Sequence, residues 1–396
     1  MNIALINSEY PQEDGSQGGI ASFTYTLATA LTDLGCKVHV LIRKGTVPQN
    51  LSPAVEVHHF EFRSAKGIKQ FVEKKFQNGA VTWEKGHSRH IRQILLTIHK
   101  QEKLNVVQIP EYGGLAYSLK PPLPFKIIVR FSMPSKLIDM INGKTTSNKR
   151  ANFYRFESKA IKNASAFISP TKALQRWLHK HMNIADIRFS VIKSPIDTRD
   201  FGDKRSYKSK TLKKILYVGR LEQRKGAGII ARYITDILKI DPKITITFAG
   251  EVEKLFISKV KQTIAKNLGY KECSRVLFLG AVNHQEISEL YKKSGILIVP
   301  SLMDNCPNTL LEGMASGLPI VCSDAEGIKE FINHGSNGLV FPLKNPQLLT
   351  TMISHIINNP RLASALGKSA LQYISKNHEI MCTGKEFLSL YKSVSN

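Results

Sequence analysis

The residues best suited to chemistry lie in one segment in the second half of the chain, from Val299 to Val321. This segment predicts a strand, a turn and a short helix, with Pro307 in the first helical turn. The backbone amides of Asn308, Thr309 and Leu310 should then point out of the helix N-terminus, where an anion such as a diphosphate binds well. The sequence therefore predicts an anion site at this turn.

Two acidic residues flank the same turn. Asp304 precedes the helix and Glu312 lies about one turn inside it, so both carboxylates can face one ligand. A carboxylate accepts hydrogen bonds from two hydroxyls at once, and a nucleotide-sugar offers vicinal hydroxyls on its ribose and its hexose as well as a diphosphate. The alternative interpretation is a capped strand–helix unit with two solvated acids, and the flanking Pro-Asn-Thr favours the ligand site.

The overall charge also points to an anionic partner. The 396-residue chain has 56 Lys and Arg against 31 Asp and Glu, a formal net charge of +25. Such a field attracts nucleic acid, anionic membrane or phosphorylated substrates, although part of it can be a solubilising surface. No apolar run approaches a membrane span, the first residues indicate a strand and not a secretory leader, and five dispersed cysteines favour a reducing cytoplasm.

The elements that would position these residues alternate between strands and amphipathic helices, which is typical of parallel sheets covered on both faces. In the first half, helices are expected from about Ile20 to Gly35, near 88–103 and near 150–163. The expected strands are 2–7, 37–42, 55–60, 105–109, 126–131, 166–169 and 189–192, then 215–218, 244–248, 276–279, 296–299 and 320–322.

A polar, basic stretch interrupts this alternation after residue 197 and predicts a linker between two domains. The predicted organisation is an N-terminal, acceptor-binding Rossmann-like domain (1–200), a linker (201–213), a C-terminal, nucleotide-sugar-binding Rossmann-like domain (214–375), and a last helix (376–396) packing back toward the first domain. We expect two doubly wound parallel sheets facing a central cleft, with ligands beyond the carboxyl ends of the strands.

The segment from Val299 to Val321 resembles the donor-binding motif of the retaining glycosyltransferases of family 4, also called glycosyl transferases group 1, which have the GT-B fold. Relatives usually have two glutamates separated by seven residues, and here Asp304 and Glu312 occupy those positions. The resemblance implies that Asp304 contacts the donor hexose, that Glu312 binds the ribose hydroxyls, and that the amides of residues 308–310 hold phosphate.

Two other segments extend the resemblance. Gly219-Arg220-Leu221…Lys225-Gly226 is similar to a family element in which Arg220 and Lys225 would reach the diphosphate. Fixed cations there would stabilise the charge that the leaving group gains, so no metal ion or other cofactor is required. Gly18 and Gly19, after the first strand, resemble the family loop beside the transferred sugar, where glycine permits close backbone approach.

The remaining matches are less specific. Residues 323–330 resemble a family loop in which Glu330 either orients the loop or caps a helix, with Glu326 in place of a glycine. Residues 193–197 resemble the family's Asn-Pro-x-Asp, with serine for asparagine. On the acceptor side, Arg130 and Ser132 lie where many relatives have Arg-Leu-His, so the usual histidine is absent.

The resemblance implies a cytoplasmic hexosyltransferase that uses a UDP- or GDP-sugar with retention, the departing phosphate oxygen taking the acceptor proton. Residues 68–76 predict a basic amphipathic helix that either docks on the anionic inner face of the membrane or packs on the first sheet. Docking would favour a glycolipid or lipid-linked oligosaccharide acceptor in surface polysaccharide (lipopolysaccharide, O-antigen or capsule) synthesis, with the stretch 135–150 as a mobile acceptor loop.

Two rival functions come from other classes. A nucleic-acid-binding protein would explain the charge, but no aromatic-interleaved basic motif or recognition helix is present, so no nucleic-acid partner is expected. A nucleotide-sugar epimerase would keep the fold and change the reaction, whereas a phosphorylase would need a pyridoxal-phosphate lysine site that the sequence does not show. The twelve histidines have no metal-ligand spacing, so no metal site is expected.

Overall fold

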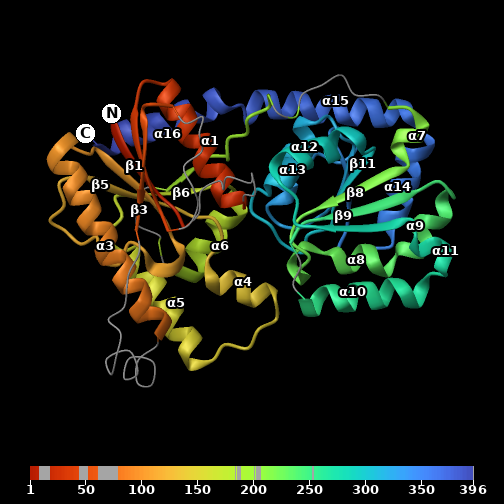
Figure 1. Ribbon diagram of the computed structural model, residues 1–396, viewed down its shortest axis with the longest axis horizontal. Helices are drawn as coiled ribbons and strands as arrows, with labels where there is room; N and C mark the ends of the chain where they lie inside the picture. Colours follow the sequence, from red (N-terminus) through yellow and green to blue (C-terminus); the bar gives the residue numbers. More distant parts are fainter. Residues whose placement is uncertain are drawn as a thin grey trace. The chain divides into compact units, whose positions relative to one another are not determined.

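The computed structural model describes residues 1–8, 18–43, 52–60, 79–182, 184, 189–199, 201, 207–251 and 254–395. These residues form two compact units. The first unit contains the described residues up to Pro195 and the C-terminal helix from Ile380, and the second contains those from Ile196 to Glu379. Each unit is built on a parallel sheet with helices on both of its faces (Figure 1).

The sheet of the first unit has the strand order β3-β2-β1-β4-β5-β6-β7. Its strand order reverses between β1 and β4, and the carboxyl ends of the strands at such a point are where doubly wound sheets bind ligands. The strands are β1 (Asn2–Ile6), β2 (Lys37–Ile42), β3 (Val55–His59), β4 (Val106–Pro110), β5 (Lys126–Arg130), β6 (Ala166–Ser169) and β7 (Phe189–Val191).

Apolar side chains on consecutive positions make the central strands suitable for burial on both faces, as parallel sheets require. β4 and β6 are buried along their whole length, and helices pack on either side of them. The helices are α1 (Gly19–Asp33), α3 (Gly79–Glu102), the 3-10 helix η1 (Tyr112–Gly114), α4 (Ser135–Ile141), α5 (Asn148–Ala160), α6 (Lys172–Met182) and α16 (Ile380–Ser395).

The last helix, α16, completes the core of the first unit although it is distant in sequence. Phe387 packs against Phe23 of α1 with ring centroids 5.9 Å apart. The hydroxyl of Tyr391 donates a 2.7 Å hydrogen bond to the buried side-chain oxygen of Gln108 on β4. Residues 376–379, which we expected in this helix, belong to the second unit.

The stretch 135–150 is a loop only over residues 142–147, and not along the whole length that its lysines and polar residues suggested. It contains α4 and the start of α5, and these two helices are joined through the buried carboxylate of Asp139. Asp139 accepts hydrogen bonds from Arg150 and Tyr154 of α5. A tertiary ion pair of this kind leaves no periodic apolar pattern in the sequence, which explains why α4 was missed. α5 was expected near 150–163 and begins two residues earlier. The helix expected at 68–76 lies outside the described residues.

The second unit has the strand order β10-β9-β8-β11-β12-β13, again fully parallel. The order reverses between β8 and β11, so these two neighbours form the switch point of this sheet. The strands are β8 (Lys214–Val218), β9 (Thr245–Ala249), β10 (Val276–Gly280), β11 (Ile296–Val299), β12 (Ile320–Ser323) and β13 (Leu339–Phe341).

The residues expected as a linker lie in this unit wherever they are described. Phe201 and Leu212 are buried in its core. The hydroxyl of Tyr207 donates to the carbonyl of Gly317. The helices of the unit are α7 (Ser209–Leu212), η2 (Gln223–Lys225), α8 (Ala227–Arg232), α9 (Ile234–Ile240), α10 (Lys254–Asn267), α11 (Tyr270–Cys273), α12 (His284–Lys293), α13 (Asn308–Ala315), η3 (Ile328–Glu330), α14 (Leu348–Asn358) and α15 (Pro360–Asn377).

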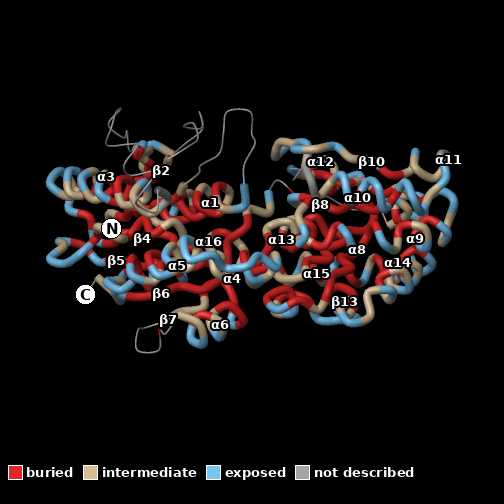
Figure 2. The backbone as a smooth tube through the Cα atoms, turned by 90° about the horizontal axis from the view of Figure 1, so that it is seen from below, coloured by how far each residue is buried: buried red, intermediate tan, exposed pale blue. Residues whose placement is uncertain are grey.

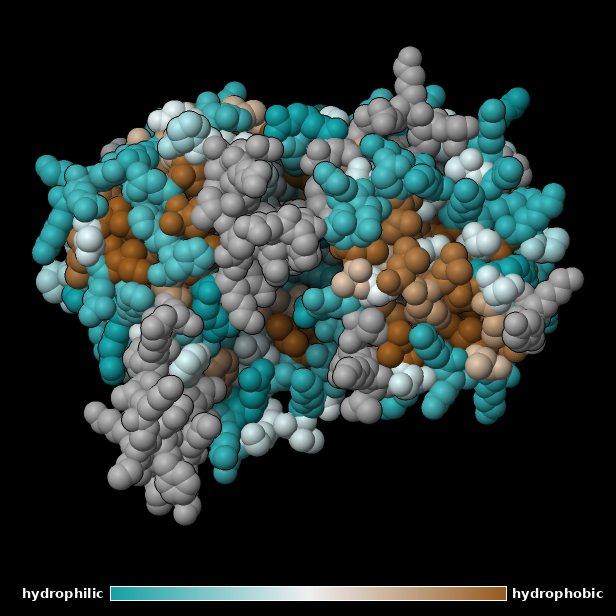
Figure 3. All heavy atoms as spheres, in the orientation of Figure 1, coloured by the Kyte–Doolittle hydropathy of each residue, from teal (hydrophilic) through white to brown (hydrophobic). Residues whose placement is uncertain are grey.

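The pattern of buried and exposed residues is the one expected for two sheets that helices cover on both faces. The strands are buried along most of their length, whereas the outer helices alternate between buried and exposed positions (Figure 2). Hydrophilic side chains project over much of the face shown in Figure 3, as the excess of lysine and arginine requires. Among the helices described, none is both long and apolar enough to cross a bilayer.

Candidate functional site

Three neighbouring strands of the second sheet, β8, β11 and β12, deliver polar groups at their carboxyl ends. After β8 the chain forms η2, which carries Arg224 and Lys225. After β11 it forms the turn with Asp304 that leads into α13, and after β12 it forms the loop that ends with Glu330 in η3. Because these strands are adjacent and parallel, residues far apart in sequence meet at one sheet edge.

Asp304 is the centre of a buried charge cluster at this edge. Its residue is only 5% exposed, as is that of Arg224. One carboxylate oxygen lies 3.3 Å from Nη1 of Arg224, and the other accepts a 2.5 Å hydrogen bond from Nζ of Lys225. The hydroxyl of Ser301 and the backbone amide of Asn305 also donate hydrogen bonds to this carboxylate. Asp304 is therefore held between two cations.

The charges in this cluster are tightly coupled. Burial alone would raise the pKa of Asp304, but the positive charges of Lys225 and Arg224 outweigh it and hold the pKa below its usual value. Burial lowers the pKa of Lys225, although Asp304 opposes the change. Arg224 is also bound by Glu222, whose carboxylate lies 2.7 Å from Nη2. A buried charge network of this kind fixes the positions of its members.

Glycines allow the backbone segments to pack this closely. Gly226, directly after Lys225, has a φ of 75°, and a Cβ on it would lie 1.8 Å from the carbonyl oxygen of Pro300. Gly327 has a φ of 87°, and a Cβ there would lie 2.1 Å from the carbonyl oxygen of Asp304. The loops after β8 and β12 are thus pressed against the turn after β11.

The short helix α13 begins one residue later than expected, because Pro307 is its N-cap and not its first residue. The amide of Leu310 does not point out of the helix: it donates a 2.9 Å hydrogen bond to the carbonyl of Pro307. This amide, which was predicted to hold phosphate, is therefore already used within the helix. Asn308 and Thr309 occupy the first two helical positions, where backbone amides face the N-terminal end.

The remaining predicted groups lie near this turn. Glu312 on α13 accepts a 2.9 Å hydrogen bond from the hydroxyl of Tyr291, a fully buried residue of α12. Arg220 keeps 62% of its side chain exposed and reaches only to 3.8 Å from Glu222. Glu330 closes η3, and its backbone carbonyl accepts from the hydroxyl of Tyr373. The edge thus presents the exposed guanidinium of Arg220 beside a buried charge cluster.

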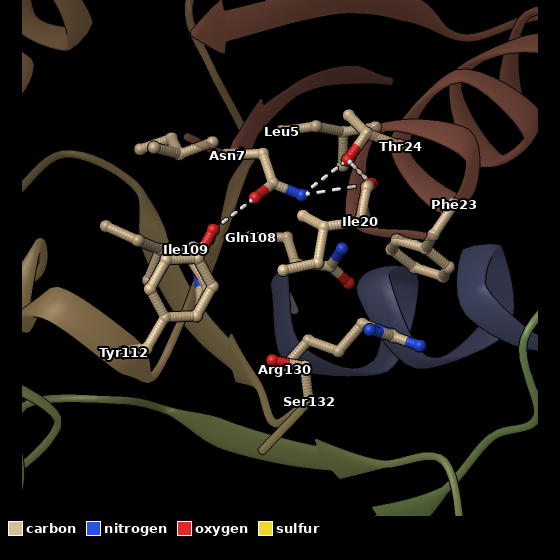
Figure 4. Close-up of a pocket in the computed structure, with 12 residues that line it drawn as sticks. Leu5, Asn7, Ile20, Phe23, Thr24, Gln108, Ile109, Tyr112, Arg130 and Ser132 are labelled. Atoms are coloured by element: carbon tan, nitrogen blue, oxygen red, sulfur yellow. Dashed lines mark hydrogen bonds between the residues drawn. The ribbon is translucent and has the colours of Figure 1, made fainter. Parts of the chain in front are cut away.

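The first unit has a separate pocket at its own switch point, shown in Figure 4. Asn7, which follows β1, bridges it: its side-chain nitrogen donates to Thr24 of α1, and its oxygen accepts from the hydroxyl of Tyr112. Gly18 is the extended N-cap of α1 and Gly19 its first residue. The predicted glycines therefore begin the helix that forms one wall of this pocket.

Arg130 and Ser132 line the same pocket, as Figure 4 shows. The guanidinium of Arg130 lies 3.5 Å from the ring centroid of Phe23 and donates to the hydroxyl of Ser194. The amide of Ser132 donates to both oxygens of the buried Glu111 carboxylate at 3.0 Å. The acceptor-side residues are thus fixed by partners from several elements.

Two of these groups, Arg224 and Glu111, were not predicted from the sequence. Arg224 lies between Gln223 and Lys225 in a chain rich in basic residues, and only its burial distinguishes it. Glu111 follows β4 directly, and its place at a strand's carboxyl end was the signal available. Burial raises the pKa of Glu111 to about 7.

Stability should depend on the protonation of buried carboxyls in the first unit. Burial raises the pKa of Glu111 and that of Glu157 to about 7, above the ordinary 4.5. A carboxyl whose pKa is raised by folding stabilises the folded state below the unfolded pKa and loses that contribution as pH rises through the folded pKa. We therefore expect the free energy of unfolding to fall between about pH 4.5 and pH 8, by up to about 3 kcal/mol per carboxyl.

Urea unfolding across this pH range tests that expectation by comparing wild type with Glu111→Gln. The variant should show a smaller fall, because glutamine does not titrate and the other titrating groups remain common to both proteins. Glu326→Gln, an exposed position, serves as the matched control and should keep the wild-type slope. An unchanged slope in Glu111→Gln would contradict the assignment.

Two glycosyltransferase family descriptions match consecutive parts of the chain and together cover most of it. The family described as Glycosyltransferase Family 4 matches residues 17–200, and that described as Glycosyl transferases group 1 matches residues 199–373. An uncharacterized glycosyltransferase of Methanocaldococcus jannaschii is 24% identical over 99% of this chain and 98% of its own length.

Two further proteins are similar. A lipopolysaccharide core biosynthesis mannosyltransferase of Rhizobium leguminosarum bv. viciae is 28% identical, over 44% of this chain and 49% of its own. The structure of Anabaena HepE in complex with UDP and glucose aligns with a TM-score of 0.73 at 16% identity, covering 99% of this chain and 100% of the other. Two parallel-sheet units and the two consecutive family matches agree, and the chain is a glycosyltransferase of family 4 with the GT-B fold.

Proposed function

We propose that this glycosyltransferase transfers a hexose from a UDP- or GDP-sugar with retention of configuration. The observation that carries the proposal is the buried cluster of Arg224, Lys225 and Asp304 at the carboxyl ends of β8 and β11. An ammonium has three donors, and Asp304 engages one donor of Lys225. The other donors can bind the diphosphate of a donor sugar.

The chemistry follows from the charge that develops during transfer. As the bond between the anomeric carbon and the phosphate oxygen breaks, the diphosphate gains negative charge, and fixed cations stabilise it. Lys225 and the exposed Arg220 supply that charge, while Asp304 holds Lys225 in place. Asp304 is then a positioning residue, because both of its oxygens are already engaged. We therefore propose that Asp304 positions Lys225, in place of the direct contact with the hexose that the resemblance implies.

Retention requires the new bond to form on the face that the leaving group vacates. The acceptor hydroxyl attacks the anomeric carbon there and gives its proton to the departing phosphate oxygen, so no protein base is needed. Ser132, which stands where many relatives have histidine, is compatible with this route. Glu312, oriented by Tyr291, binds the ribose hydroxyls, and the amides of Asn308 and Thr309 face the phosphate.

The donor and acceptor classes rest on the similar proteins. HepE was solved with UDP and glucose, and the Rhizobium relative is a mannosyltransferase of lipopolysaccharide core synthesis. We propose a membrane-associated glycolipid or lipid-linked oligosaccharide acceptor in surface polysaccharide (lipopolysaccharide, O-antigen or capsule) synthesis. The enzyme would act in the cytoplasm at the inner face of the membrane, with Gly18, Gly19, Arg130, Ser132 and Glu330 contributing to the substrate sites.

The test is transfer from radiolabelled UDP-glucose, UDP-N-acetylglucosamine and GDP-mannose to lipid-linked acceptors extracted from the host envelope. We expect one donor to label a glycolipid, and nuclear magnetic resonance of the product to show the anomeric configuration of the donor. Inverted configuration would refute retention. Conversion of the donor to an epimer without acceptor would instead establish the rival epimerase function.

A further inference from the structure

Two histidines and a glutamate of the first unit meet at the edge of the sheet formed by β2 and β3. His39 on β2 is the register partner of Glu56 on β3, and His58 lies two residues beyond Glu56 on the same strand face. Nδ1 of His39 lies 3.2 Å from Nε2 of His58 and 3.4 Å from Oε2 of Glu56. Nε2 of His58 lies 3.9 Å from the same oxygen.

These separations are within about 0.3 Å of those between metal ligands. Tetrahedral zinc with bonds of roughly 2.0–2.2 Å holds its ligand atoms about 3.3–3.6 Å apart. We propose that His39, His58 and Glu56 form a binding site for a transition metal ion such as Zn²⁺, with water as the fourth ligand. The site is distinct from the sugar-transfer chemistry, because it lies on the outer strands β2 and β3 and not at the switch point of the sheet.

The groups around the cluster orient its ligands. Glu102, the last residue of α3, places Oε2 3.2 Å from Nε2 of His39, and metal-bound histidines commonly donate their second ring nitrogen to a carboxylate. Both of these atoms are buried, and in the part of the chain that is described neither has another hydrogen-bond partner. Lys37 binds the Oε1 atoms of Glu56 and Glu102, which leaves each Oε2 directed at the histidines.

The two facing ring nitrogens and the charge around them also favour a metal. Without a metal, the two facing nitrogens can share only one proton. With neutral histidines, Lys37, Glu56 and Glu102 sum to a charge of −1 in a chain of +25, so the cluster is a local attractor for a cation.

The three ligands differ in how far they are buried, and this difference leaves the site open to solvent. His39 is only 1% exposed, whereas Glu56 and His58 keep part of their side chains exposed, so an ion can reach the site from solvent. The metal would join two adjacent strands and, through Glu102, the end of α3. We therefore assign it a structural role in the first unit. The sequence gives no such signal, because 18 residues separate the two histidines and only the strand register brings them together.

The test is Zn²⁺ binding by the full-length, chelator-treated protein, followed by competition with a chromophoric chelator. Wild type should bind one Zn²⁺ per chain and gain thermal stability, whereas Mg²⁺, which prefers oxygen ligands, should have no such effect. His58→Ala should weaken Zn²⁺ binding at least about tenfold. Glu56→Gln, at a second partly exposed position, should also weaken Zn²⁺ binding. This variant keeps the test valid if His58→Ala does not fold.

His59→Ala is the matched control, because His59 is the adjacent, exposed histidine on the opposite strand face. It should bind Zn²⁺ as wild type does. The proposal is overturned if wild type fails to bind Zn²⁺ at high micromolar concentration. It is equally overturned if folded His58→Ala and Glu56→Gln bind as tightly as wild type, since the ion would then lie elsewhere.

Discussion

Asp304→Asn is expected to lower the free energy of unfolding by about 3–5 kcal/mol, because it removes one partner of a buried charge network. Asparagine keeps the shape of the side chain but leaves Lys225 without a counter-charge and Arg224 with Glu222 alone. Sugar transfer should fall by at least about 100-fold, since the cation that stabilises the leaving diphosphate loses its fixed position. Urea unfolding and initial-rate assays measure the two effects.

Two controls separate charge from packing. Glu289→Gln removes a carboxylate from a solvent-exposed ion pair and should leave both stability and transfer unchanged. Adding Lys225→Met to Asp304→Asn removes the unpaired charge, and this double variant should regain stability but not activity. If Asp304→Asn is as stable and as active as wild type, the buried cluster is neither structural nor functional.

Gly226→Ala should be the most destabilising single-methyl substitution at this site. A Cβ would lie 1.8 Å from the carbonyl oxygen of Pro300, so the backbone of η2 or of the turn after β11 must move. The left-handed conformation alone costs an alanine about 1–2 kcal/mol. The clash should bring the total above about 4 kcal/mol, a loss that single substitutions rarely reach. Because Lys225 directly precedes this glycine, transfer should be lost as well.

Gly280→Ala isolates the conformational part of that loss. Gly280 has a φ of 76°, against 75° for Gly226, but a Cβ there meets no atom within 4 Å. The control should therefore lose only about 1–2 kcal/mol and keep its activity. Thermal or urea unfolding of both variants gives the difference, and equal losses would show that close packing at Pro300 is not what requires the glycine.

Much of the fold could be predicted because buried parallel strands are short apolar runs between polar residues. The predicted bounds of β2, β6 and β11 are those of the structure. The three-residue strand β13 (Leu339–Phe341) was not predicted. Helix α4 was missed because an ion pair between Asp139 and Arg150, and not an apolar stripe, joins it to α5.

The candidate site was predictable only in part. Motif spacing indicated the turn with Asp304 and the helix with Glu312, and adjacent parallel strands bring them to the same sheet edge as Lys225. The spacing could not show that Arg224 and Lys225 donate hydrogen bonds to the carboxylate of Asp304, because these contacts depend on how the side chains are buried. Nor could it show that the amide of Leu310 is used within the first helical turn.

The central claim is that the edge formed by η2 and α13 binds a nucleoside diphosphate, and titration calorimetry with UDP and GDP tests it most directly. We expect wild type to bind one of the two in the micromolar range. Glu312→Gln should weaken that binding at least about tenfold, or about 1.4 kcal/mol, while Glu289→Gln binds as wild type. The account is contradicted if neither nucleotide binds the folded protein at millimolar concentration, or if Glu312→Gln binds with unchanged affinity.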